Sequence, residues 1–443
     1  MADPTGATTR EQRGGRVRHL LALNHFANPL DAPGGTRLVE LSSRLHGWRT
    51  TIVAADRNLF TRRRRRVVRP GYVTVPTLPY DSNGPARIAN WVTYAVGATV
   101  VGLRVERPDV VLASSPHLLT GLAGWLVARV RRVPFVFEVR DMWPRILVDV
   151  GRLRPGSPSH RVLRALERFL YHHAEAIVVL AAGVADAVVD EGIPPERIHL
   201  VPNGADPDDF TPSRPREELR RRYGFGGFTI VYTGAHGPAN GLDLVLDAAR
   251  DLARELPEVT FVLVGDGLSR PGLMERARRE SLHNVVFLQP VPKAEIPDLL
   301  AAADAGLHVL ADVPLFLYGV SPNKLFDYMA AGLPVLTNTG GEIGRLVTDR
   351  DTGVAIAPRE LADGVRRLVA ADAARRAAWG ANGRALIRAE RDRGAMAARL
   401  QLLLDRLCPA SPAPDGLPSP AAARRSGPHG TVIRHPSSAP GLP

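Results

Sequence analysis

Short apolar runs recur along the chain, and they alternate with stretches whose apolar side chains are spaced about three or four residues apart. The first run, residues 17–23, precedes a glycine-containing loop and a stretch of helical spacing over residues 36–45. Continuous apolar runs are typical of strands buried on both faces, and the wider spacing is typical of helices with one buried side. This order predicts the opening of a βαβ unit.

The same alternation predicts elements in both halves of the chain. Further strands are expected at residues 51–54, 110–113, 133–139, 177–180, 259–264, 285–288, 303–310 and 335–338, and another runs into a glycine loop within residues 228–237. Helices are expected at residues 118–131, 162–174, 184–190, 241–252, 294–302 and 360–388, and a last apolar stripe lies within residues 396–407. The pattern indicates an α/β fold with parallel sheets.

Length and composition extend this picture to two domains. The 443 residues are 45% hydrophobic, and single domains usually have about 100–200 residues, so two cores can form. The single cysteine, Cys408, excludes a disulfide framework within the chain. Residues 1–15 are polar, and residues 409–443 are rich in proline, alanine, serine, glycine and arginine, so we expect both ends to be disordered. The N-terminal residues contain no apolar signal core, which favours a cytoplasmic location.

The net charge of +12 favours anionic partners such as nucleic acid, anionic lipid or sugar-nucleotide phosphates. Nucleic acid is disfavoured, because neither zinc-finger spacing nor an aromatic–basic signature is present. The densest charge run consists of Arg62, Arg63, Arg64, Arg65 and Arg66. It is either a solvated loop or, together with the uncharged residues 88–103, a surface that binds the inner face of an anionic membrane. Residues 88–103 alone also suit a core helix and are too short for a comfortable span.

Residues 321–334 contain both a start and a stop signal for a helix. Ser321 is expected to cap the helix and Pro322 to suit its first turn. Gly332 suits a left-handed exit, and Pro334 prevents continuation. The stretch therefore predicts a short helix with well-defined ends.

One face of this helix is polar, because Lys324, Asp327 and Tyr328 fall on the same side at about 100° per residue. Lys324 lies in the first turn, where free backbone N–H groups and the helix dipole favour an anion such as phosphate. Asp327, one turn later, suits the hydroxyls of a ribose. The alternative is a capped surface helix with a weak Lys–Asp pair.

Glycines follow several of the predicted strands, at the ends where ligands bind to open parallel sheets. A phosphate can approach a glycine backbone closely, so these residues are candidates for contact with a nucleotide. They are Gly34 and Gly35 in the first half, and Gly234, Gly265 and Gly267 with Asp266 between the last two. An ordinary tight turn remains the alternative at each.

Charged residues lie at the end of the strand at residues 133–139. Glu138, Arg140 and Asp141 either bind a ligand there or form an arginine–carboxylate network that fixes the loop. Asp206-Pro-Asp208 has the spacing of an Asp-x-Asp metal site, but no strand leads to it, so we expect no metal there.

Residues 321–334 resemble the donor-site helix of family 4 glycosyltransferases, whose pattern is Glu, seven residues, Glu, then Ala-Met-Ala-x-Gly-x-Pro. Asp327 falls on the second Glu, whereas Gly319 replaces the first. Residues 135–144 resemble the Glu-Val-Arg-Asp-x-Trp-Pro segment of a bacterial branch that includes WbuB-like N-acetyl-amino-sugar transferases. In that segment Arg140 stands where many members have His, and Asp141 aligns with their Asp.

The resemblance implies a GT-B fold, with two Rossmann-like domains that face each other across a cleft. It implies a first, acceptor-side domain at residues 16–205, a nucleotide-sugar domain at 206–390 and a helix at 391–408 that returns to the first domain. Two charges of the family are missing, because Ala235 and Asn240 replace its diphosphate-binding Arg and Lys. We expect Lys324, with Arg270, to compensate.

The resemblance also implies a reaction: transfer of a hexosyl or N-acetylhexosaminyl group from a nucleoside-diphosphate sugar, expected to be UDP-linked, to a hydroxyl with retention and without a metal. The expected acceptor belongs to polysaccharide or glycoconjugate synthesis and is lipid-linked if the membrane interpretation holds. Lys324 would bind phosphate, Asp327 ribose, and Arg140 with Asp141 would orient the acceptor. The alternatives are a sugar-nucleotide epimerase on the same fold and a non-catalytic sugar-nucleotide-binding protein.

Overall fold

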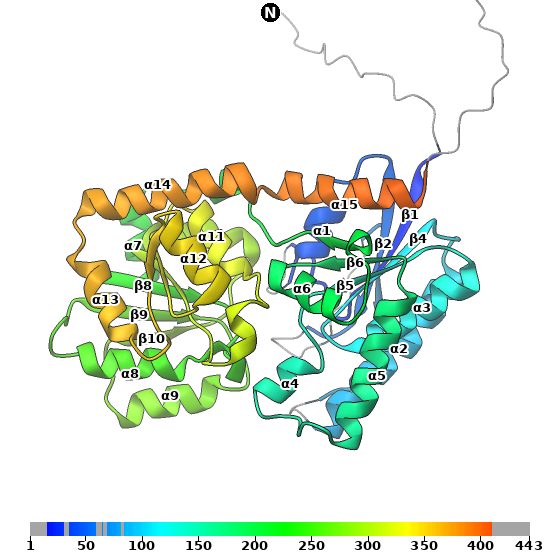
Figure 1. Cartoon of the computed structure of the whole chain (residues 1–443). Coiled ribbons are helices and arrows are strands. Elements are labelled where there is room, and N and C mark those ends of the chain that lie inside the picture. Colours follow the sequence, from blue (N-terminus) through cyan, green and yellow to red (C-terminus); the bar gives the residue numbers. More distant parts are fainter. Residues whose placement is uncertain (1–15, 31–34, 59–63, 65–68, 81–83, 410–443) are drawn as a thin grey trace, which may run out of the picture. The chain divides into compact units, whose positions relative to one another are not determined.

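The computed structural model describes residues 16–30, 35–58, 64, 69–80 and 84–409 (Figure 1). Residues 1–15 and 410–443 of the predicted disordered ends, Gly34 and four arginines of the run at residues 62–66 therefore lie outside the described residues. Within the described part, two parallel sheets with helices on both faces are found. The α/β class and the two Rossmann-like domains predicted from the sequence are confirmed.

The first sheet has strand order β3-β2-β1-β4-β5-β6-β7. Its strands are β1 (Arg18–Leu23), β2 (Trp48–Ala55), β3 (Tyr72–Val75), β4 (Val110–Ser114), β5 (Phe135–Val139), β6 (Ala176–Val179) and β7 (Ile198–Leu200). In the centre, Leu21 pairs with Thr51 on one side and Val111 on the other, and its side chain is fully buried. Such burial on both faces explains the continuous apolar runs.

Helices cover both faces of the first sheet. They are α1 (Arg37–Ser42), α2 (Pro85–Arg104), α3 (Leu118–Arg131), α4 (Arg145–Asp149), α5 (Pro158–His173) and α6 (Ala182–Asp190). Residues of α2, α3, α5 and α6 share one hydrophobic cluster with the sheet. Residues of α1 share the other cluster with a helix from the far end of the chain, α15 (Arg393–Leu407). The last helix therefore completes the core of the first half.

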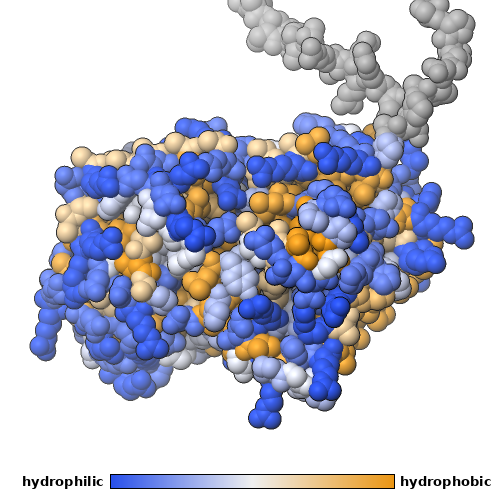
Figure 2. Space-filling view, in the orientation of Figure 1, coloured by the Kyte–Doolittle hydropathy of each residue, from blue (hydrophilic) through white to orange (hydrophobic). Residues whose placement is uncertain are grey.

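The second sheet has strand order β10-β9-β8-β11-β12-β13. Its strands are β8 (Phe228–Thr233), β9 (Val259–Val264), β10 (Val285–Leu288), β11 (Ala305–His308), β12 (Val335–Thr337) and β13 (Gly353–Ala355). The helices around it are α7 (Arg216–Tyr223), α8 (Asp243–Leu252), α9 (Arg270–Arg279), α10 (Ile296–Ala302), α11 (Asn323–Ala330), α12 (Gly341–Asp349), α13 (Leu361–Ala370) and α14 (Ala373–Glu390). Figure 2 shows mostly hydrophilic atoms over α8 and α9, as expected for helices that bury one side only.

The predicted start of α11 needs correction. Ser321 does not cap α11: the N-cap residue is Pro322, and the Ser321 hydroxyl accepts a hydrogen bond from the backbone N–H of Asn203 instead. Gly332 does adopt the predicted left-handed conformation, with φ of 77°. No described helix is long and apolar enough to cross a membrane.

Candidate active site

Both sheets have a point where the strand order reverses, between β1 and β4 in the first and between β8 and β11 in the second. Ligands of open parallel sheets bind beyond the carboxyl ends of the strands at these points. The loops that follow these four strands are therefore the first place to look for a site. Gly35 and Gly234 lie in these loops, and Lys324 and Asp327 lie on the helix after the β11 loop, whereas the remaining described candidates lie at the ends of the neighbouring strands β9 and β5.

The loops after β8 and β9 in the second half pack backbone against backbone, and glycine is required for this contact. The N–H of His236 donates to the carbonyl of Asp266 over 2.9 Å. A Cβ atom at Gly265 would lie 1.8 Å from the carbonyl oxygen of Gly234, and one at Gly267 would lie 2.5 Å from that of His236. All three glycines have φ near 150°. These glycines therefore hold two loops together above the sheet.

Lys324, in the first turn of α11, reaches the first of these loops. A Cβ atom at Gly234 would lie 2.9 Å from the Lys324 Nζ. The ammonium donates a hydrogen bond of 2.7 Å to the Tyr232 hydroxyl and lies 3.9 Å from the centre of that ring. No described carboxylate lies within 4.0 Å of it, and burial lowers the pKa of Lys324 to about 7. The geometry leaves a cation without a counterion.

His236, in the first of these loops, is close enough to both Lys324 and Arg270 to feel their charges. Burial, together with the charges of Arg270 and Lys324, lowers the pKa of His236 to about 4, so the imidazole is neutral. Both of its ring nitrogens, and the Nε of Arg270, are buried without a hydrogen-bond partner. These unsatisfied groups line the same glycine loops, and an anion bound there would satisfy the donors among them.

Asp327 lies one turn beyond Lys324 and is buried. Its Oδ2 accepts a hydrogen bond of 2.7 Å from Lys293, while its Oδ1 is buried without a partner. Lysine occurs at only two positions in the sequence, Lys293 and Lys324. Both lysines thus lie at the polar side of one short helix.

Tyr328 does not belong to the polar face, which corrects the prediction from helical spacing. Its side chain is fully buried, and its hydroxyl accepts the backbone N–H of Thr233 over 2.8 Å. A Cβ atom at Gly306 would lie 2.3 Å from its ring. Tyr328 therefore packs α11 against β8 and β11. Helical spacing failed to show this, because α11 is buried on more than one side.

In the first half, histidines from two loops meet beyond β1 and β4. His25 Nδ1 and His117 Nε2 are 2.8 Å apart and both rings are buried. Burial, with the charge of Arg87, lowers the pKa of His117 to about 3. Trp91 of α2 stacks on His117 at 5.1 Å and contacts Trp143 edge-on at 5.3 Å. Sequence reasoning missed this group, since its members are far apart in the chain.

Glu138 belongs to an arginine–carboxylate network, which is the second of the two roles expected for it from the sequence. Its Oε1 accepts from Arg37 Nε over 2.9 Å, and its Oε2 accepts from the Ser114 hydroxyl. Burial alone would raise the pKa of Glu138, but the charges of Arg37 and Arg140 and the Ser114 hydrogen bond hold it below its usual value. Arg37 also donates to the carbonyl of Val201. The network thus joins α1, β5 and the segment after β7.

Arg140 and Asp141 follow Glu138 at the end of β5 and have freer side chains. The Arg140 guanidinium makes no ion pair within the described residues, and a Cβ atom at Gly35 would lie 3.8 Å from it. Asp141 is exposed to solvent, yet the surrounding chain still desolvates it enough to raise its pKa, with Arg140 opposing this effect. The structure therefore brings Arg140 to Gly35. No described hydrogen bond or ion pair joins either side chain to Lys324.

The two halves meet directly at α11. Asn203 donates from its side-chain amide to the carbonyl of Ser321 over 2.5 Å, in addition to the backbone bond described above. Asp206, the first residue of the Asp-x-Asp spacing, accepts from Arg44 over 2.6 Å and from Arg393 over 3.1 Å. No group of three or more potential ligands within the described residues is placed to hold a metal ion.

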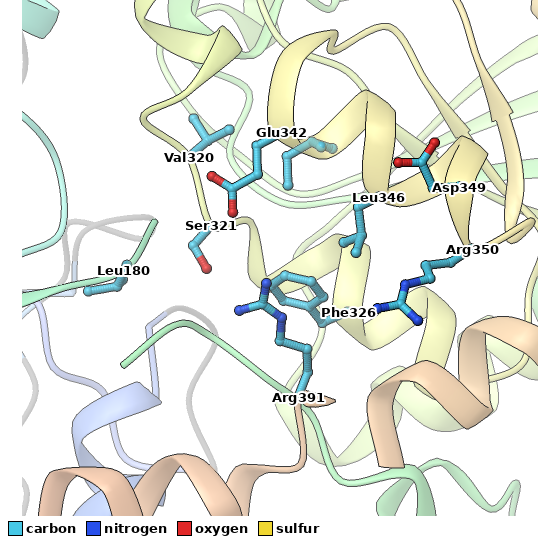
Figure 3. A pocket seen from close by; sticks show the side chains of 10 residues that line it. Leu180, Val320, Ser321, Phe326, Glu342, Leu346, Asp349, Arg350 and Arg391 are labelled. Atoms are coloured by element: carbon cyan, nitrogen blue, oxygen red, sulfur yellow. The ribbon is translucent and has the colours of Figure 1, made fainter. Parts of the chain in front are cut away.

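A separate pocket of about 190 Å³ lies between α11 and α12, where it is lined by Phe326 and Leu346. Figure 3 shows Glu342 and Arg391 pointing into it near Ser321 and Phe326. Neither Lys324 nor Asp327 lines this pocket, nor does either glycine loop. The cation without a counterion and the unsatisfied donors lie at the glycine loops, outside this pocket. Glu342 faces this separate pocket.

Comparison with protein families gives two matches that follow one another along the chain. The family described as "Glycosyl transferase 4-like domain" matches residues 35–204, and the family described as "Glycosyl transferases group 1" matches residues 227–371. The probable glycosyltransferase WbjE of Pseudomonas aeruginosa is 27% identical over 63% of this chain and 69% of its own length. A D-inositol 3-phosphate glycosyltransferase of Thermobispora bispora is 27% identical over 77% of this chain and 83% of its own length.

Solved structures share the fold. Alr3699/HepE of Anabaena in complex with UDP-glucose has a TM-score of 0.64 at 18% identity, covering 88% of this chain and 99% of that one. WaaG, described as a glycosyltransferase involved in lipopolysaccharide biosynthesis, also has a TM-score of 0.64 at 18% identity, covering 88% of this chain and 100% of that one. The two-sheet architecture is therefore that of known nucleotide-sugar-binding structures.

Proposed function

Since the chain belongs to the family 4 glycosyltransferases and has their GT-B fold, we propose that it transfers a hexosyl or N-acetylhexosaminyl group from a UDP-sugar to a hydroxyl. The observation that carries the proposal is Lys324, a cation at a glycine loop with no described carboxylate beside it. Removing an ammonium from water is costly, so such a position is favourable mainly when an anion completes it. The diphosphate of a sugar nucleotide is that anion.

The proposed donor site contains the two lysines in different roles. Lys324, together with Arg270 at the start of α9, would neutralise the diphosphate, and Asp327 would accept the hydroxyls of the ribose through its free Oδ1. Lys293 would hold Asp327 in place through the bond to Oδ2. The name of the complex of Alr3699/HepE with UDP-glucose supports UDP as the nucleotide.

The proposed reaction breaks the bond between the anomeric carbon and the diphosphate oxygen and forms a new bond to the acceptor oxygen on the same face of the sugar. The acceptor proton goes to the departing diphosphate. Negative charge grows on the leaving group in the transition state, and a positioned cation stabilises it by about 3–4 kcal/mol. In this proposal Lys324 supplies that charge stabilisation from the protein itself.

The acceptor is proposed to bind at the first half, beyond β1, β4 and β5. Arg140 has no ion-pair partner within the described residues, and Asp141 is exposed beside it, so both are available to orient a hydroxyl compound. Trp91 and Trp143 offer aromatic surfaces at the same end of the sheet. A sugar face packs well on such rings. We propose an acceptor of polysaccharide or glycoconjugate synthesis.

The test is a panel of nucleoside-diphosphate sugars with and without hydroxyl acceptors, assayed for free UDP and for glycosylated product. Acceptor-dependent release of UDP with an α-configured product from an α-configured donor is expected. A changed sugar nucleotide without any acceptor would show an epimerase. Binding of UDP-sugar without turnover, by calorimetry and with a full acceptor panel, would show a binding protein. Either result would overturn the proposal.

A further inference from the structure

Helix α2 carries a row of apolar side chains that no described part of the chain covers. Its inner side is fixed in the core, where the Tyr94 hydroxyl donates to the carbonyl of Val53 and a Cβ atom at Gly102 would lie 2.8 Å from Val127 of α3. The outer side of α2 and the neighbouring part of α3 form what we term the α2–α3 face. It consists of Ile88, Val92, Val96, Val100 and Leu103 on α2 and Leu126 and Val130 on α3, all of them exposed.

The spacing shows that this face is a continuous stripe. Four of the α2 residues recur at every fourth position, so they lie one above the other along a helix of about 30 Å. Val96 in the middle of the stripe is 60% exposed. Single exposed apolar residues need no explanation, but a contiguous stripe usually marks a binding surface.

The charge around the stripe indicates which kind of partner would fit this surface. Neither α2 nor α3 contains an acidic residue. Arg104 and Arg129 are exposed beside the stripe, and neither has a carboxylate within 4.0 Å among the described residues. Basic side chains next to an apolar helix face suit an anionic lipid surface, where the helix lies in the plane of the interface.

A second copy of the chain fits this face less well. A two-fold interface places the same patch of each copy against the other, so Arg104 and Arg129 would meet a patch that also carries arginines and whose two helices contain no acidic residue. Like charges that meet in an interface cost free energy, whereas anionic lipid headgroups neutralise them. We therefore propose that the α2–α3 face docks the protein on an anionic membrane.

The same helix connects this surface to the candidate acceptor site. Trp91, on the inner side of α2, stacks on His117. Docking through the outer side would therefore hold the acceptor end of the first sheet close to the bilayer. This last consequence, access to a lipid-linked hydroxyl, rests on the proposed function, whereas docking itself does not.

The test is co-sedimentation of the full chain with vesicles of phosphatidylcholine alone or mixed with phosphatidylglycerol, at low and high salt. We expect binding only to the anionic vesicles, weakened by salt. The double variant Val92→Gln with Val96→Gln should bind about tenfold more weakly. Arg104→Gln or Arg129→Gln should each weaken binding about fivefold.

Exposed apolar residues elsewhere provide a matched control. Leu402 of α15 is 60% exposed, like Val96, and Val286 lies on the edge strand β10. The double variant Leu402→Gln with Val286→Gln should bind vesicles like the wild type. Thermal unfolding confirms that each variant is folded, and UDP release with a water-soluble acceptor should not change, which separates docking from activity.

Three results would overturn docking. The first is a wild type that stays equally in the supernatant with and without anionic vesicles at low salt. The second is a control pair that weakens binding as much as the α2–α3 pair does. The third is a dimer in gel filtration that only the α2–α3 pair dissociates, without vesicle binding, which would assign the face to a second copy.

Discussion

Lys324 illustrates how a residue proposed for binding can oppose stability. Its pKa of about 7 means that the ligand-free protein holds this side chain partly neutral, whereas the unfolded chain keeps it protonated up to a much higher pH. Because the unfolded state binds more protons, the free energy of unfolding rises with pH from about 7 to the ordinary lysine pKa. An anion at the Nζ has the opposite effect and raises the pKa.

Replacing Lys324 by methionine should therefore change stability and binding in opposite directions. The ligand-free variant should unfold a few degrees higher at pH 7, because no charge is desolvated. Its affinity for UDP should fall by about a hundredfold, whereas uridine should bind almost unchanged. Thermal unfolding and calorimetry measure the two effects. A variant that loses stability and keeps UDP affinity would contradict this role.

The titration of Lys324 can be followed directly, because the chain has only one other lysine. Amine acetylation at increasing pH, with peptide mapping, should show Lys324 becoming reactive near pH 7, and UDP should protect it. In calorimetry above pH 7, UDP binding should take up a proton, so that the measured enthalpy depends on the buffer. Lys293 serves as the internal reference for the reagent. Equal labelling with and without UDP would place the diphosphate elsewhere.

Asp327→Asn should affect a different part of the nucleotide. A charged acceptor contributes about 1.5–3 kcal/mol to a hydrogen bond, so we expect UDP and uridine to bind roughly tenfold more weakly alike. Lys324→Met, in contrast, should discriminate between the two. Asp351→Asn is the matched control, since that carboxylate pairs with Arg375 at the surface of the second half. If Asp327→Asn weakened UDP but not uridine, the ribose assignment would be wrong.

At the scale of residues, the sequence indicated which side chains are candidates for a site, but it did not indicate which other side chains they contact. Helical spacing placed Lys324 and Asp327 on one face, but it could not show that Lys293, in a short 3-10 helix 34 positions earlier, binds Asp327. It also placed Tyr328 with them, although the ring is buried against Gly306. His117 gave no signal, because its partner His25 is 92 positions away. Each of these contacts depends on tertiary packing.

At the scale of elements, glycine loops shape the candidate donor site. The Gly265→Ala change would place a methyl group about where the Gly234 carbonyl lies, at 1.8 Å, and no flexible side chain can yield there. The two loops would have to separate. We expect a loss of at least about 2 kcal/mol in unfolding free energy and a severe loss of UDP binding, measured by urea unfolding and calorimetry.

Gly272→Ala is the control for this change. Gly272 lies within α9, a Cβ atom added there would have no neighbour within 4 Å, and its φ is not positive. Alanine favours a helix interior by about 0.5–1 kcal/mol over glycine, so this variant should be slightly more stable and bind UDP normally. Equal effects of the two substitutions would mean that the close approach of the loops is not required.

Buried strands were the elements predicted best. Residues 259–264 have the predicted bounds as β9, because a continuous apolar run between polar turns is typical of a buried strand in a parallel sheet. The edge strand β10 also has its predicted bounds, residues 285–288, although its residues are partly exposed. The short edge strands β3, β7 and β13 were missed, since they are only three or four residues long. Ser321 does not cap α11, because its hydroxyl accepts a hydrogen bond from the backbone N–H of Asn203 in the first half.

At the scale of the whole molecule, α14 and α15 connect the two halves. Helix α14 packs on α11 of the second half, and α15 packs on α1 of the first. The connection passes Gly204, where a Cβ atom would lie 2.0 Å from the Arg391 carbonyl, and Ala205, whose N–H donates to the same carbonyl. The segment after β7 and the start of α15 are thus held together by backbone contacts.

Arg393 anchors the start of α15 and should be the most sensitive residue of this connection. Its side chain is only 7% exposed and binds Glu40 at 3.0 Å, Asp206 at 3.1 Å and the Gly204 carbonyl at 3.0 Å. Arg393→Met would leave Glu40 buried without its cation, while Asp206 keeps Arg44. Removing one partner of a buried pair costs about 3–5 kcal/mol, and the remaining Arg44 pair favours the lower end of that range.

The matched control for Arg393 is Arg388→Met, close by in α14. Arg388 pairs with Asp208 at 3.1 Å, but both side chains are largely exposed, so its loss should cost less than about 1 kcal/mol. Urea unfolding of the two variants, followed by tryptophan fluorescence, measures the difference. If both variants lost the same free energy of unfolding at neutral pH, the buried ion pairs of Arg393 would contribute no more to stability than the exposed pair of Arg388.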